Sequence, residues 1–288
     1  MTDMAEASSV LGIDISRNQE KDLLGLSQRF YIEKVLKRFN MQDCACSDVP
    51  IAKGDKLSTE QAPKTEQEKL EMADKPYALL VGSLMYAQVC TRPDLAYAVS
   101  MLGRFQSNPG QAHWVAGKKV MRYLQRTKDY KLVFKRSENL ELQGFADAYF
   151  AGCQDTLKST SGFVFMFRGA AVSWRSIQQP LTIGSTMLAE FLACYEATSQ
   201  AMWLRNFIIS LSVVESIHRP IQLWNDNSAA MTFAKETKEQ EEKINQGYTT
   251  IDHIGTDQMI ADPLTKGVPN AVFHRHVSSM GLTADMDA

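Results

Sequence analysis

The sequence lacks the features by which a chain enters a membrane or cross-links itself. No apolar run approaches the ~20 residues that a membrane-spanning helix needs, and residues 1–9 show no basic stretch followed by an apolar one, as a signal peptide would. The five cysteines form no Cys-x-x-Cys pair and are odd in number, which fits a reducing compartment better than a disulfide framework. We therefore expect a soluble intracellular protein, cytoplasmic or nuclear, without a membrane partner.

The sequence also lacks a net charge that would draw it to nucleic acid. Its formal charge is −2, so any such binding must come from local basic surface. One basic stretch runs from 118 to 136, with eight Lys or Arg residues against one acid. This stretch is either solvated surface or a track for the phosphates of a duplex. Its helical part contributes Lys118, Lys119, Arg122 and Arg126.

The first half of the chain has a mostly helical pattern. After strands expected at 10–16 and 23–26, the apolar spacing predicts helices over 27–39, 77–90, 93–105 and 112–127. The helix over 77–90 is apolar nearly all round, so we expect it to be buried. A polar segment, residues 42–75, is interrupted by proline and glycine and predicts a loop with at most a short helix.

From residue 130 onward the pattern changes to strands. Alternation predicts strands at 131–134, 140–147, 161–167 and 171–174, then a helix over 186–211, a strand ending near 226 and a further helix from 228. This order predicts an α/β fold in which a mixed sheet with flanking helices brings the ends of separate elements to one edge. We therefore divide the chain into regions 1–129 and 130–288.

Four isolated carboxylates stand at these element ends. Asp147 lies in or near the end of a strand, Glu190 near the start of the long helix, Asp226 after the next strand and Asp262 in a late segment expected to be helical. A lone aspartate at a strand end is more often a solvated turn residue. A buried carboxylate, however, needs a cation, a hydrogen-bond donor or water, so four of them gathered at one edge would favour a metal site.

Several sequence blocks resemble the ribonuclease H domain of copia-type retrotransposon polyproteins. They are Gly144 to Gly152, Lys158 to Phe163, Val172 to Ser176, Ser185 to Ala193 and Asp257 to Lys266. The first half resembles the C-terminal, thumb- and connection-like region of the reverse transcriptase that precedes this domain in the same polyproteins, without the polymerase active site. The resemblance there rests on Leu11-Gly12-Ile13, Gln28 to Ile32, Gly82 to Tyr86 and Thr91 to Asp94.

The resemblance implies a ribonuclease H, a hydrolase and endonuclease that cleaves the RNA strand of RNA–DNA hybrids. It implies two Mg²⁺ ions, or Mn²⁺, held by the acidic tetrad Asp147, Glu190, Asp226 and Asp262, since Mg²⁺ prefers carboxylate oxygens. RNA is distinguished from DNA by its 2′-hydroxyls, and Ser159 and Asn227 are candidates for those contacts, with equally good roles as turn and strand-end residues. Upstream parts of such a polyprotein are a possible further partner.

Three departures from the family pattern leave a second hypothesis open. The chain has no Tyr-x-Asp-Asp turn, so we expect no polymerase activity from it. Tyr149 and Leu188 stand where the family commonly has acids. The interval between Asp226 and Asp262 is shorter than in family members, so whether Asp262 reaches the other acids is open. The alternative is a catalytically inactive retroelement relic that acts at most as a nucleic-acid-binding or interaction module.

Overall fold

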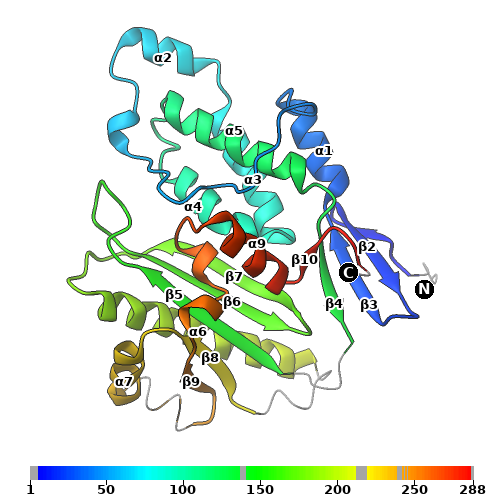
Figure 1. The fold of residues 1–288 in the computed structure, drawn as a ribbon, viewed down its shortest axis with the longest axis vertical. Helices are drawn as coiled ribbons and strands as arrows, with labels where there is room; N and C mark the ends of the chain where they lie inside the picture. The colour runs from blue at the N-terminus through cyan, green and yellow to red at the C-terminus, as the bar shows by residue number, and fades with distance from the viewer. Residues whose placement is uncertain are drawn as a thin grey trace. The chain divides into compact units, whose positions relative to one another are not determined.

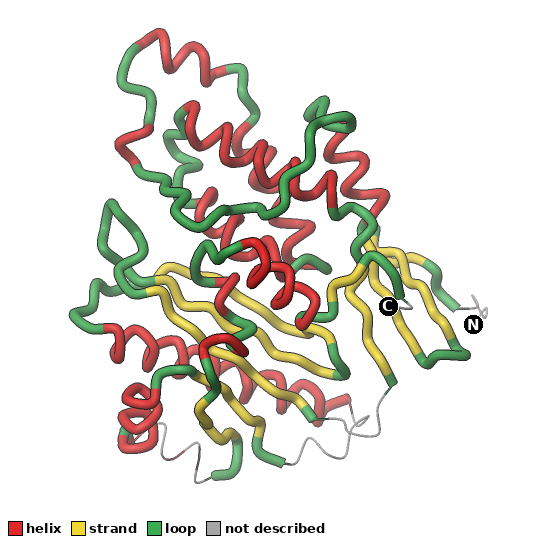
Figure 2. The backbone as a smooth tube through the Cα atoms, viewed as in Figure 1, coloured by secondary structure: helices red, strands yellow, loops and turns green. Residues whose placement is uncertain are grey.

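A computed structural model describes residues 6–136, 141–211, 219–238, 242, 244 and 246–286. The chain forms two compact units, and each combines a five-stranded sheet with helices (Figures 1 and 2). Unit 1 comprises Met1–Arg136 with Gly281–Ala288, and unit 2 comprises Ser137–Met280. The structure therefore confirms the mixed α/β class.

The sheet of unit 1 is antiparallel throughout and has the strand order β1-β2-β3-β4-β10. Its strands are β1 (Ser9–Val10), β2 (Ile13–Asn18), β3 (Leu23–Ser27), β4 (Lys131–Lys135) and β10 (Leu282–Thr283). Leu132 of β4 pairs with Leu26 on one side and with Leu282 on the other. The strand over 131–134, predicted to begin the second region, thus belongs to the sheet of unit 1, where it pairs with β3 and β10.

Five α-helices and two 3₁₀ turns complete the described part of unit 1. They are α1 (Arg29–Arg38), η1 (Thr59–Gln61), α2 (Glu66–Ala73), α3 (Tyr77–Cys90), η2 (Pro93–Leu95), α4 (Ala96–Gly103) and α5 (Gln111–Arg126). The expected short helix in the polar segment is α2, which begins at a capping box: the Thr65 hydroxyl accepts from the Glu68 amide at 3.2 Å. The expectation that 77–90 is buried all round is wrong, since Leu79, Met85 and Val89 are exposed.

A buried charged network stabilises the middle of unit 1. Arg92 is fully buried and forms a two-bond ion pair with Asp94, at 3.0 Å from Nε to Oδ1 and 2.7 Å from Nη2 to Oδ2. The Tyr123 hydroxyl donates to the same carboxylate at 2.6 Å, and Arg92 also donates to the Thr127 carbonyl at 3.1 Å. These bonds tie η2 to α5, and their mutual satisfaction is what makes a buried ion pair tolerable.

The sheet of unit 2 is mixed and has the strand order β7-β6-β5-β8-β9. β5, β6 and β7 are antiparallel neighbours, whereas β8 lies parallel to both β5 and β9. The strands are β5 (Leu142–Tyr149), β6 (Thr160–Phe167), β7 (Ala170–Gln178), β8 (Ile221–Asn225) and β9 (Thr249–His253). β9 has no counterpart among the predicted strands.

The helices of unit 2 flank this sheet. They are α6 (Thr186–Leu211), α7 (Ser228–Glu236), η4 (Thr256–Gln258), η5 (Asp262–Leu264) and α9 (Asn270–Ser279). Asp262 therefore opens a 3₁₀ turn and not the late helix that we expected, because Gly267 and Pro269 follow within a few residues and stop a longer helix. Within the described ranges, no helix is long and apolar enough to cross a bilayer.

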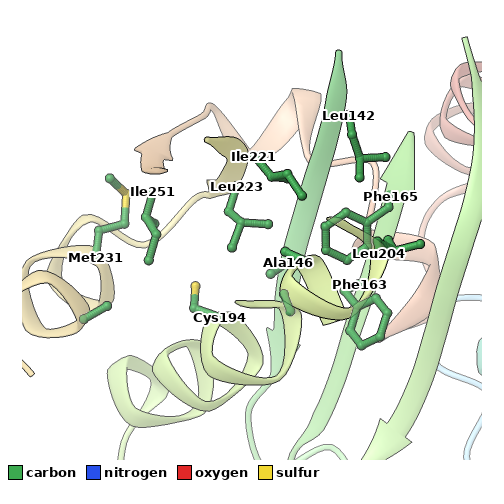
Figure 3. Close-up of a cluster of buried hydrophobic side chains, with 13 residues drawn as sticks. Leu142, Ala146, Phe163, Phe165, Cys194, Leu204, Ile221, Leu223, Met231 and Ile251 are labelled. Carbon is green, nitrogen blue, oxygen red and sulfur yellow. The ribbon is translucent and has the colours of Figure 1, made fainter. Parts of the chain in front are cut away.

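The core of unit 2 lies between α6 and the sheet. Figure 3 shows Cys194 of α6 near Ala146, Leu223 and other apolar side chains of the strands. Small residues recur one helical turn apart along the buried side of α6, at Ala193, Ala197 and Ala201, and they let the helix lie close to the strands. This packing fixes the strand ends, from which the acidic side chains project.

Candidate metal centre

The parallel pairing of β5 with β8 aligns two of the predicted acids. Phe145 of β5 lies opposite Trp224 of β8, so Asp147 and Asp226 occur two residues further along each strand, at the same edge of the sheet. Asp147 is 1% exposed and Asp226 is half-buried. The register therefore brings these two carboxylates together, although they are 79 positions apart in the chain.

Asp262 is the third acid of this cluster. One carboxylate oxygen each from Asp147, Asp226 and Asp262 lies within 4.8 Å of the other two. The short interval between Asp226 and Asp262 thus does not keep Asp262 away from the strand ends. We call these three residues the Asp triad. Oxygen-only ligands of this kind suit hard divalent cations, so the Asp triad can hold a metal ion.

Glu190, the fourth predicted acid, lies beside the Asp triad but is not one of the residues that meet this distance limit. It is 4% exposed, and its Oε2 accepts a 3.0 Å hydrogen bond from the Asn225 amide. Burial and the nearby charge of Asp147 raise the pKa of Glu190 to about 9. In the absence of metal, Glu190 is therefore protonated at neutral pH.

Asn225 positions Glu190 against the sheet. Its side chain is fully buried, and its amide nitrogen donates to the Ala146 carbonyl at 2.9 Å as well as to Glu190. Its amide oxygen accepts from the Asn227 backbone at 2.9 Å. One side chain thus connects β5, α6 and the turn after β8. This role was not predicted from the sequence, in which its only signal is a polar residue directly before Asp226.

Two further residues that the sequence analysis missed lie against the Asp triad. The Lys266 ammonium is 2.9 Å from Asp262 Oδ1 and 3.5 Å from Asp147 Oδ2, and the Thr265 hydroxyl donates to Asp147. Although burial opposes it, the charges of Asp147 and Asp262 raise the pKa of Lys266. The available signal was the spacing of Lys266, four residues after Asp262, which lets oppositely charged side chains meet on one turn.

The two carboxylates beside Lys266 remain costly to ionise. Burial raises the pKa of Asp147, against the opposing effect of Lys266. Burial and the charge of Asp147 raise the pKa of Asp262 to about 6. Bringing these acids together in a buried site therefore favours a bound cation, because a cation offsets both the burial and the mutual repulsion.

The four basic residues of the expected phosphate track lie on α5 of unit 1: Lys118, Lys119, Arg122 and Arg126. Two of them have acidic partners in the polar segment. Lys119 is 2.5 Å from Asp55, and Arg126 is 2.9 Å from Asp48. These ion pairs reduce the charge that α5 offers to a phosphate backbone, and phosphate binding by this helix stays a prediction.

The two predicted 2′-hydroxyl contacts have local hydrogen bonds. The Ser159 hydroxyl, fully buried, accepts from the Ala151 amide at 3.1 Å. The Asn227 side chain caps α7 by accepting from the Ala230 amide at 3.0 Å. Both side chains thus stabilise the turns that flank the acids, and contact with RNA stays a prediction for each.

Fold and site together define a mixed α/β protein with a carboxylate triad able to hold a metal ion. The chain is 38% identical over 286 residues to the retrovirus-related Pol polyprotein from transposon TNT 1-94 of Nicotiana tabacum, an alignment that covers 95% of this chain and 21% of the polyprotein. It is 29% identical over 294 residues to the retrovirus-related Pol polyprotein from transposon RE1 of Arabidopsis thaliana, with 98% and 19% covered. Secreted RxLR effector protein 161 of Plasmopara viticola is 46% identical over 133 residues, which are 46% of this chain and 94% of the effector.

The chain belongs to the copia-type retrotransposon Pol polyproteins. It spans about a fifth of the length of the polyproteins that it matches. No family model and no solved structure matches it.

Proposed function

We propose that unit 2 is a ribonuclease H-like domain that hydrolyses the RNA strand of RNA–DNA hybrids in a Mg²⁺-dependent reaction. The observation that carries this proposal is the meeting of Asp147, Asp226 and Asp262, whose carboxylate oxygens lie within 4.8 Å of one another at one sheet edge. The strand order supports it as well. Three antiparallel strands, a long helix, a parallel strand and a further helix follow the order that the family resemblance implies.

The donor set fits Mg²⁺, or Mn²⁺ in its place. The Asp triad offers three hard oxygen ligands, and Asn225 orients Glu190 beside them. When bound, such an ion lowers the pKa of a water molecule and stabilises charge on a phosphate oxygen. A positive ion at the Asp triad would also lower the pKa of Glu190 and so make a fourth carboxylate ligand available.

The protein residues have positioning roles in this proposal. β5 and β8 hold Asp147 and Asp226 in register, and η5 holds Asp262 over the same edge. The buried surroundings exclude competing water from Asp147, so charge interactions there are strong. An RNA–DNA hybrid is the expected substrate, and the upstream parts of a longer polyprotein are the expected partner that delivers it.

Two observations favour a second candidate function, that of an inactive nucleic-acid-binding or interaction module. The Lys266 ammonium already neutralises part of the charge of Asp147 and Asp262, and Glu190 is outside the Asp triad. A site that kept this arrangement would bind no metal. The domain would then act only by binding nucleic acid or another protein through its surface.

The test is cleavage of an end-labelled RNA–DNA hybrid by the full chain in Mg²⁺, read on a gel. We expect wild-type protein to cleave the RNA strand and Asp147→Asn to reduce cleavage to background. Asp252→Asn is the matched control, since Asp252 lies on β9 and its carboxylate accepts only from Gln222, at 3.2 Å, among its hydrogen bonds in the described residues. Cleavage by both Asp147→Asn and wild type, or by neither, refutes the proposal. Hybrid binding without cleavage supports the second candidate.

A further inference from the structure

Lys266 lies against two members of the Asp triad and is more exposed than either of them. Its Nζ lies 2.9 Å from Asp262 Oδ1 and 3.5 Å from Asp147 Oδ2. Its side chain is 27% exposed, whereas those of Asp147 and Asp262 are 1% and 8% exposed. The ammonium thus places a positive charge beside the same carboxylate oxygens that would hold a metal ion.

A divalent ion and this ammonium cannot share the carboxylates equally. Both are cations, and both require the lone pairs of Asp147 and Asp262. An ion held by the Asp triad would repel an ammonium group at the present distances. One of the two must therefore leave, or the carboxylates must separate.

Of these groups, Lys266 is the one that can move. Its ammonium ends a flexible four-carbon stem that reaches water easily. Within the described residues, its two ion pairs are both with the Asp triad, so no other acid holds it in place. Asp147, by contrast, is fixed by the β5 ladder and also accepts from the Thr265 hydroxyl.

We propose that Lys266 is a resident counter-cation, a positioning residue that holds Asp147 and Asp262 together in the metal-free protein and withdraws to solvent when a divalent cation binds. The inference rests on the proposed function, because it concerns the same metal site. In this proposal, the apparent affinity for metal depends on the free-energy difference between the site paired with the Lys266 ammonium and the site that holds the metal ion. Removing the ammonium tightens metal binding, although it weakens the metal-free fold.

The experiment follows Lys266 by chemical labelling of the full chain. Wild-type protein is treated briefly with an amine-acetylating reagent in EDTA or in Mg²⁺ at matched ionic strength, and acetylation of each lysine is measured by mass spectrometry. We expect Mg²⁺ to increase acetylation of Lys266 severalfold. Lys119 is the matched control, because it is 23% exposed and paired with Asp55 at 2.5 Å in unit 1, and its acetylation should not change.

Calorimetry with Mg²⁺ then compares wild type with Lys266→Met and with Lys69→Met, because Lys69 is a paired lysine of unit 1 that lies 2.6 Å from Glu66. If the Lys266-paired state makes up about nine tenths of the metal-free protein, removing it tightens apparent binding about tenfold. Lys69→Met should bind Mg²⁺ as wild type does. Thermal unfolding in EDTA checks that each variant folds, and the labelling result needs no variant at all.

The outcomes separate the two proposals. Mg²⁺ uptake with unchanged Lys266 acetylation and unchanged affinity in Lys266→Met overturns the counter-cation role, and the proposed nuclease stands. Increased acetylation and tighter binding in Lys266→Met, without hybrid cleavage, support the counter-cation role and refute the nuclease. Absence of Mg²⁺ uptake by wild type and by Lys266→Met overturns both.

Discussion

Gly162 lets the turn that carries Asp262 and Lys266 lie directly on the sheet. It pairs with Asp147 across β5 and β6. A Cβ added at this position would lie 2.7 Å from Thr265 Cγ2, 3.0 Å from Leu264 Cβ and 3.2 Å from the Leu264 carbonyl carbon. Replacing Gly162 with alanine therefore tests whether the position of this turn determines the properties of the Asp triad.

The expected size of the effect follows from these distances. Carbon atoms normally approach to about 3.5–4.0 Å, so a 2.7 Å contact forces Thr265 and its neighbours back by roughly 1 Å. Such overpacking typically costs about 1–3 kcal/mol of unfolding free energy. A displacement of about 1 Å at a catalytic group can cost about 100-fold in rate. It would also separate the Thr265 hydroxyl from Asp147.

The assay pairs Gly162→Ala with Gly144→Ala. A Cβ at Gly144 would meet Leu223 at 2.4 Å and Phe165 at 2.6 Å, inside the core and away from the turn. We expect both variants to lose stability in urea unfolding, but only Gly162→Ala to lose Mg²⁺ affinity and about 100-fold in hybrid cleavage. Wild-type affinity and cleavage in Gly162→Ala, or an equal loss in Gly144→Ala, would refute the reasoning.

Two further predictions concern buried charges. Arg92→Met should cost about 3–5 kcal/mol in urea unfolding because it leaves the Asp94 carboxylate buried without its cation, and Arg92→Met combined with Asp94→Leu should cost less; additive losses would contradict this. Glu190 has a folded pKa of about 9, above its ordinary value of 4.5, so the folded protein retains a proton that the unfolded chain releases. The unfolding free energy in EDTA should therefore fall as the pH rises from about 5 to 9. The fall should be smaller in Glu190→Gln, and parallel pH profiles for the two proteins would rule out this assignment.

The sequence predicted the local elements of unit 2 better than their neighbours in space. The strands ending at Asp147 and Asp226 and the long helix carrying Glu190 were visible because apolar spacing reports which face of an element is buried. The pairing of β4 with β3 could not be predicted, since the same alternation of apolar and polar residues suits a strand in any sheet. β9 was missed because a five-residue strand after a polar, charged segment gives a weak signal.

The candidate metal site, too, could be predicted only in part from the sequence. The acids could be selected as candidates because a carboxylate near a strand end is chemically conspicuous. The roles of Asn225 and Lys266 could not be predicted, because the role of an amide or an ammonium group depends on which groups lie beside it in the fold. Asn225 meets Glu190 from 35 residues away in sequence, and no local pattern encodes that contact.

The pairing of β10 with β4 has a consequence for how the protein is made. A ribosome must synthesise all of residues 137–280 before the last strand of the first sheet exists. Until then β4 presents an open hydrogen-bonding edge, the kind that invites pairing with other chains. A fragment ending after β4 should therefore aggregate more readily than the whole chain, and adding a peptide of the tail, Gly281 to Met286, should suppress that aggregation.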